Sequence, residues 1–165
     1  MHNKTRDPLE FPLIGKLFWH DGRAFKLFKS SPRDKKQYLY YVAPSTAEEK
    51  VSGTGPVTFT TDMLQSVVVD HLRSQLRDPH KWLSVLIEKS KENPKPEEAV
   101  IVQALKKLDD DWPLSTPQSQ AHTLFTLVER VNVFPDQLGI SFNWPAVLNL
   151  VLVKEMVQSS VVRHA

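Results

Sequence analysis

The chain of 165 residues contains no cysteine. Disulfides and thiolate metal sites are therefore excluded, and the composition is compatible with the reducing cytoplasm, where we expect the protein to act. Residues 1–10 are polar, so we expect no secretory signal peptide there. The longest apolar run, 146–153, is far shorter than the roughly 20 residues that a membrane span requires. We therefore expect no membrane partner.

Catalytic motifs are missing as well. The sequence has no glycine-rich phosphate loop and no GxSxG turn, and its six histidines form no HxxxH or HxxH pair. Only His20, beside Asp21 in a basic segment, is a candidate for a special role. The adjacent carboxylates of 109–111 have no partner ligands at a recognisable spacing, so a solvated helix end is predicted there. We predict a non-enzymatic protein that needs no cofactor.

The net charge of +2 conceals an uneven distribution. Residues 1–42 carry nine Lys or Arg against four Asp or Glu, a net charge of +5, whereas the remaining 123 residues carry twelve against fifteen, a net charge of −3. A compact positive patch favours a polyanionic partner, because binding releases condensed counterions. The alternative is a solvated ribbon whose lysines protect its edge from aggregation.

The first part of the chain has the pattern of short strands. Aromatic and β-branched residues predict strands near 13–19, 23–29 and 37–43, arranged as an antiparallel meander, with a turn at His20-Asp21-Gly22. A meander of this size has little core of its own and must pack on another part of the protein. Residues 44–58 are rich in Pro, Ser, Thr and Gly and are predicted to be a linker.

The rest of the chain is predicted to be mainly helical. Apolar residues first recur with a helical period between Met63 and Leu76, with Thr60 or Thr61 as the cap and Asp78-Pro79 as the interruption. The period changes to two over 131–142, which predicts a β-hairpin, and Pro145 opens a last helix. The predicted fold class is α+β. The predicted domains are 1–58, with leader, basic ribbon and linker, and 59–165, with helices and hairpin.

An N-terminal and a C-terminal part of the chain together resemble a known family. The segments 12–18 (PLIGKLF), 21–23 (DGR) and 38–42 (YLYYV) resemble the ribbon domain of large serine recombinases of the resolvase/invertase family. Downstream, 127–140 (LVERVNVFPDQLGI) resembles the C-terminal signature of the same family. The order and spacing of the segments, with helical material between them, also fit. The resemblance covers roughly residues 11–142.

The resemblance implies a DNA-binding region that follows a catalytic resolvase domain. In many members of the family the ribbon holds zinc through two CxxC-type pairs. In this chain Phe18 and Asp21 stand where the first pair would be, and Ala43 follows the Tyr-Tyr-Val segment where another cysteine often stands. We therefore predict a cysteine-free ribbon without zinc. The catalytic serine belongs to a domain that this chain does not contain, so its partners would be double-stranded DNA and a recombinase catalytic domain or second subunit.

Basic and aromatic residues of the ribbon are the predicted DNA-binding site. Lysines around the turns would neutralise phosphates, and Arg23 or Arg33 would reach a guanine edge in the major groove. The tyrosines would pack the ribbon and offer hydroxyl groups to phosphates. The predicted residues are Arg23, Lys26, Lys29, Arg33, Lys35, Lys36, Tyr38 and Tyr40.

The sequence also allows two alternative functions. In the first, the helical part from Thr60 to Leu108 docks another protein subunit, and the ribbon only covers the core. In the second, the chain is a non-catalytic remnant of a recombinase that retains its fold, which is compatible with the missing cysteines and with Leu39, where the family usually has a basic residue.

Overall fold

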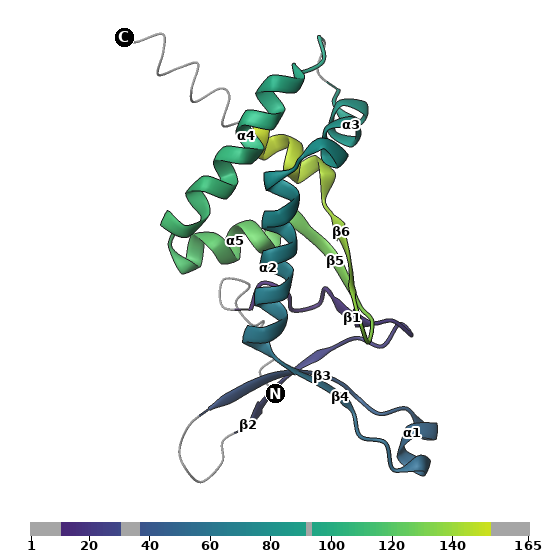
Figure 1. Cartoon of the computed structure of the whole chain (residues 1–165). Coiled ribbons are helices and arrows are strands. Elements are labelled where there is room, and N and C mark those ends of the chain that lie inside the picture. Colours follow the sequence, from purple (N-terminus) through teal and green to yellow (C-terminus); the bar gives the residue numbers. More distant parts are fainter. Residues whose placement is uncertain (1–10, 31–36, 92–93, 153–165) are drawn as a thin grey trace, which may run out of the picture.

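The computed structural model describes residues 11–30, 37–91 and 94–152 and has an α+β fold, as the sequence predicts (Figure 1). Helix α2 stands in the centre, with one small sheet across its lower end and a second sheet along its side. The elements, in chain order, are β1 (Leu17–Trp19), β2 (Lys26–Ser30), β3 (Tyr38–Ala43), α1 (Ala47–Ser52), β4 (Val57–Thr60), α2 (Thr61–Arg77), α3 (His80–Lys89), α4 (Glu98–Asp111), η1 (Trp112–Leu114), α5 (Pro117–Leu127), β5 (Val128–Val133), β6 (Leu138–Phe142) and a last helix from residue 144.

The predicted N-terminal meander is wrong in its first strand. The sheets have the orders β2-β3-β4 and β1-β5-β6, and β1 runs parallel to β5, with Leu17 opposite Val131. Phe18 forms an isolated bridge with Ala24. Pairing with β5 places Leu17 in the core, where it is 1% exposed. A free-standing three-stranded meander offers no comparable burial.

The predicted linker is also wrong, because 44–58 contains α1 and the first half of β4. The Thr46 side chain accepts a hydrogen bond from the Glu49 backbone N–H, and Gly53 ends the helix with a φ of 77°. Glycine tolerates this left-handed conformation without the steric cost that a β-carbon brings. Strand β4 pairs antiparallel with β3, so the predicted domain boundary after residue 58 falls inside a strand.

Helix α2 carries the largest share of the core. Its side chains Leu64, Val68, Leu72 and Leu76 are at most 2% exposed and pack at helical spacing. Thr60 caps the helix by accepting a hydrogen bond from the Met63 N–H at 3.2 Å, and the helix ends at Arg77, before Asp78-Pro79. The predicted helix, its Thr60 cap and its end before Asp78-Pro79 are confirmed.

The predicted C-terminal hairpin is confirmed. Val131 pairs with Ile140 and Val133 with Leu138 across the β5–β6 turn. A last helix follows, and the Asn143 side chain caps it by accepting a hydrogen bond from the Ala146 N–H at 3.2 Å. The change of hydrophobic period therefore predicts both the hairpin and its place in the chain.

The predicted solvated end at 109–111 needs a correction. Asp109 is 7% exposed and forms ion pairs with Arg73 and Arg77 of α2. Helix α4 lies against α2, and the carboxylate points at its neighbour instead of at solvent. Trp112, which follows the three carboxylates, is also buried and holds this end of α4 in the core.

Lys16 stabilises the junction between α5 and β5. Its ammonium group donates hydrogen bonds to the carbonyl groups of Phe125 and Val128 and lies 4.2 Å from the centre of the Phe125 ring. A cation is favourable at this end of a helix, where the last carbonyl groups have no helical partner. We expect Lys16→Met to lower the free energy of unfolding by about 1 kcal/mol. Urea denaturation followed by circular dichroism measures this change.

Lys107→Met is the matched control, because Lys107 is an exposed lysine in the interior of α4. Its substitution is expected to change stability by less than about 0.5 kcal/mol. Equal effects of the two substitutions would contradict a specific capping role for Lys16.

Candidate nucleic-acid interface

The inner face of the β2-β3-β4 sheet fixes the ribbon on helix α2. Leu27, Tyr41 and Phe59 lie side by side on the three strands, and Leu27 and Tyr41 are buried. The Tyr41 hydroxyl accepts a hydrogen bond of 3.2 Å from Gln65 of α2. Burial raises the pKa of Tyr41, against the smaller opposing effect of this hydrogen bond. The side chain therefore stays a neutral anchor in the core.

The outer face of the same sheet carries aromatic side chains and one lysine. Because successive side chains of a strand alternate between the faces, Lys26 and Phe28 lie opposite the face of Leu27. Phe28 pairs with Tyr40 and is 56% exposed, and Tyr38, two residues further along the same face, is 41% exposed. We call Lys26, Phe28, Tyr38 and Tyr40 the ribbon surface.

The structure brings three of the predicted site residues together on the ribbon surface, namely Lys26, Tyr38 and Tyr40. Lys29 is exposed, but strand alternation places it on the other face, opposite Leu39. Arg33, Lys35 and Lys36 lie outside the described residues. Their contribution to binding remains a prediction from sequence.

Arg23 has a set of internal contacts. Its guanidinium group lies 2.8 Å from the Asp21 carboxylate, 2.9 Å from that of Glu49 and 2.6 Å from the Pro44 carbonyl oxygen. These contacts join the β1–β2 turn to α1. A base contact by Arg23 would require the guanidinium group to leave these partners, so its geometry favours a structural role.

Phe28 is the member of the ribbon surface that the sequence reasoning missed. In the sequence it stands among other apolar and aromatic residues, and core packing is the usual role of such a residue. Lys26 and Phe28 are two residues apart in a strand and must share a face. The same spacing joins exposed Lys29 to buried Leu27, so only the structure shows which face of the strand is exposed.

The described part of the chain carries neither a metal cluster nor a membrane-spanning helix. It contains no group of three or more His, Asp or Glu side chains that could hold a metal ion. Within the same residues, no helix combines the length and the apolar character needed to cross a bilayer.

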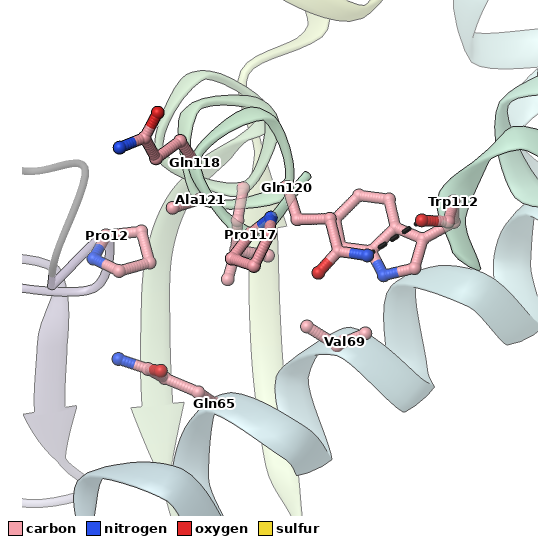
Figure 2. Close-up of a pocket in the computed structure, with 9 residues that line it drawn as sticks. Pro12, Gln65, Val69, Trp112, Pro117, Gln118, Gln120 and Ala121 are labelled. Carbon is pink, nitrogen blue, oxygen red and sulfur yellow. Dashed lines mark hydrogen bonds between the residues drawn. The ribbon is translucent and has the colours of Figure 1, made fainter. Parts of the chain in front are cut away.

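A cavity lies between α2 and α5, close to Pro12 (Figure 2). It has a volume of about 280 Å³, with Gln65 and Val69 on one side and Pro117 on the other. The Gln120 amide donates a hydrogen bond of 2.7 Å to the Trp112 carbonyl group at one end. None of the residues that line the cavity is charged.

Comparisons with known proteins leave the family of this chain undecided. No protein-family profile matches the chain, and no curated protein matches its sequence. Among the solved structures that match is one described as a crystal structure of an LSR–DNA complex, with 12% identity and a TM-score of 0.41. The match covers 86% of this chain and 58% of that chain, so the present chain spans little more than half of its length. A TM-score of this size is too low to establish a common fold.

Proposed function

We propose that this chain is a duplex-DNA-binding module of a site-specific serine recombinase, which contacts DNA through the β2–β3 ribbon. The observation that carries the proposal is the ribbon surface, where Lys26 lies on one solvent-facing side of the sheet with Phe28, Tyr38 and Tyr40. The net charge of +5 over residues 1–42 and the sequence resemblance support it. The module has no catalytic serine of its own and acts in the cytoplasm with a recombinase catalytic domain or second subunit.

Each part of the ribbon surface has a role in this mode of binding. A two-stranded ribbon is narrow enough to enter the major groove of B-DNA. Lys26 neutralises a phosphate group at the groove edge, and the hydroxyl groups of Tyr38 and Tyr40 donate to phosphate oxygens. Phe28 makes apolar contacts with thymine methyl groups on the groove floor. The inner face, anchored through Tyr41 and Gln65, keeps the ribbon rigid during binding.

The test is the affinity for a fluorescently labelled duplex of about 30 base pairs, measured by anisotropy at several salt concentrations. The double variant Lys26→Gln/Lys29→Gln is expected to bind more weakly. The slope of log K against log[salt] is expected to fall by about 0.9 for each phosphate contact that is lost. Lys26→Gln alone is expected to account for the larger part of the change, because Lys29 lies on the other face of the sheet.

Lys106→Gln/Lys107→Gln is the matched control, because it removes the same charge from two exposed positions on α4. If both double variants lose affinity equally, binding follows net charge and not the ribbon surface. Circular dichroism of all variants confirms that the fold is retained.

One observation favours a second candidate function, a protein-interaction module. Met63 and Val67 of α2 belong to the apolar stripe that the sequence predicts, yet they are 53% and 42% exposed. Two apolar side chains one turn apart on an exposed helix surface suit a protein partner. Absence of DNA binding even at low salt, together with concentration-dependent dimerisation, would favour this function. A recombinase remnant that retains only the fold would show neither DNA binding nor concentration-dependent dimerisation.

A further inference from the structure

The second sheet has a face that no described element covers. In β1 and β5, Leu17, Val131 and Val133 are buried. Helices α2 and α5 lie on one side of the β5–β6 hairpin (Figure 1). The residues that alternate with the three buried side chains are not buried. We call this surface the open face, and it consists of Phe18, His20, Arg130, Asn132, Phe134, Gly139 and Ser141.

Arg130 is held over an aromatic ring at one end of the open face. The centre of its guanidinium group lies 3.9 Å from the centre of the Phe18 ring, a cation–π contact. Its Nε atom donates a hydrogen bond of 3.0 Å to Asn132 Oδ1. Because the Asn132 oxygen accepts this bond, the amide NH₂ group remains as a donor beside the guanidinium group. A fixed cation and a fixed amide therefore lie next to each other.

Two further rings are stacked at the other end. The His20 and Phe134 rings lie 5.7 Å apart, with only 14° between their planes. Phe134 is 36% exposed. Gly139 stands beside it, and a β-carbon there would come within 3.7 Å of the Phe134 ring. This is an ordinary van der Waals distance, so the Phe134 ring packs beside Gly139.

The charge of the open face is positive. Arg130 is exposed, and the neighbouring amide and hydroxyl groups are neutral. Glu129, at the β-bulge between Val128 and Arg130, is exposed and carries the opposite charge. Burial lowers the pKa of Lys16, against the smaller opposing effect of this carboxylate.

We propose that the open face binds single-stranded nucleic acid. The Phe134 ring is the stacking position for an unpaired base, Arg130, which is held against the Phe18 ring, contacts the phosphate backbone, and the Asn132 NH₂ group donates to a base edge. Stacking on exposed rings, combined with a nearby cation, is the general means by which proteins hold single strands. Duplex DNA hides the faces of its bases within the stack, so rings on a sheet surface cannot reach them. This site is separate from the ribbon surface and does not depend on it.

The test is the affinity of the full chain for a labelled oligothymidylate of about 15 nucleotides, measured by anisotropy at low salt. Phe134→Ala is expected to weaken binding at least about fivefold, because stacking on one aromatic side chain contributes that much or more. Arg130→Gln is expected to weaken binding as well and to reduce the salt slope by about 0.7, the value for one phosphate contact on a single strand.

Phe125→Ala is the matched control, because Phe125 is 38% exposed but belongs to α5. It is expected to change the affinity for the oligothymidylate less than about twofold, within the range usual for a surface substitution. Lys26→Gln/Lys29→Gln separates the two sites, because it is expected to weaken duplex binding and to leave single-strand binding intact.

Three outcomes would overturn the proposal of a single-strand site. These are the absence of oligothymidylate binding by the wild-type chain, equal losses in Phe134→Ala and Phe125→Ala, and loss of single-strand binding in the Lys26→Gln/Lys29→Gln variant. None of them bears on duplex binding through the ribbon surface. Conversely, single-strand binding that persists without duplex binding would support the open face and contradict the proposed function of the ribbon.

Discussion

Trp82→Ala is expected to lower the free energy of unfolding by about 3–5 kcal/mol, the range for removal of a large buried aromatic side chain. Trp82 lies in α3 and is 4% exposed. Its ring centre lies 4.7 Å from that of Phe142 at the end of β6, and 5.2 Å from that of Trp144, which it meets edge-on. The substitution therefore removes contacts that join α3 to the C-terminal hairpin and to the last helix.

Urea denaturation followed by circular dichroism measures this loss, and thermal melting provides a second measure. For a chain of this size each kcal/mol lowers the melting temperature by about 2–4 °C. Trp82→Phe keeps an aromatic ring in the cluster and is expected to cost less than Trp82→Ala. Leu114→Ala is the control for an exposed position, because Leu114 is 85% exposed. A loss for Trp82→Ala no larger than that for Leu114→Ala would contradict a structural role of the aromatic cluster.

Asp109→Ala is expected to lower the free energy of unfolding by about 2–4 kcal/mol. The Asp109 carboxylate lies 2.7 Å from Arg73 Nε and 3.0 Å from Arg77 Nε, and its side chain is only 10% exposed. Without it, two arginines one turn apart on α2 face each other with no anion between them. Repulsion between like charges adds to the cost of a partly buried, unpaired Arg73.

Asp110→Ala is the matched control, because Asp110 is the exposed neighbour of Asp109 in α4. It is expected to change stability by less than about 0.5 kcal/mol. Similar losses in the two variants would mean that the ion pairs between α2 and α4 contribute little.

The contribution of Asp109 is also expected to depend on pH. Burial alone would raise the pKa of Asp109, but the hydrogen bonds and positive charges of Arg73 and Arg77 outweigh burial and hold the pKa below its usual value. A carboxyl group with a lowered pKa in the folded state stabilises the protein fully above about pH 4, and this contribution is lost as the pH falls through the folded-state pKa. The stability difference between wild type and Asp109→Asn is therefore expected to shrink as the pH is lowered below about 4. A constant difference would exclude the charge of Asp109 as the cause.

Some features that the sequence reasoning missed were nevertheless encoded locally. Thr46 and Glu49 have the spacing of a capping box, and Gly53 supplies the left-handed helix end. The sequence signals for helix α1 were therefore present within the segment predicted to be a linker. Its composition of Pro, Ser, Thr and Gly concealed this short helix. Strand β4 also has a local signal, because Val57–Thr60 (VTFT) alternates apolar and polar residues, and its pairing with β3 completes the sheet.

Sequence spacing places Lys26, Tyr38 and Tyr40 in strands, and they lie in β2 and β3, because a period of two is a property of a single strand. Their role in DNA binding stays a prediction. The internal contacts of Arg23 with Glu49 and Pro44 could not be predicted, since they depend on how a turn packs against an element more than twenty residues away. The open face of the second sheet was not predicted at all. It exists only because β1 joins β5 and places Phe18 opposite Asn132.

The sequence by itself determined the features that arise from contacts between near neighbours. These are the α+β class, the Thr60 cap and the end of α2, and the hairpin of β5 and β6. The tertiary structure alone decided the parallel pairing of β1 with β5 and the burial of Asp109 against two arginines of α2. The physical reason is distance along the chain. A cap or a hairpin is stabilised within a few residues, whereas β1 and β5 meet across more than a hundred, and only the burial of both strands in a common core compensates for the entropy of closing so long a loop.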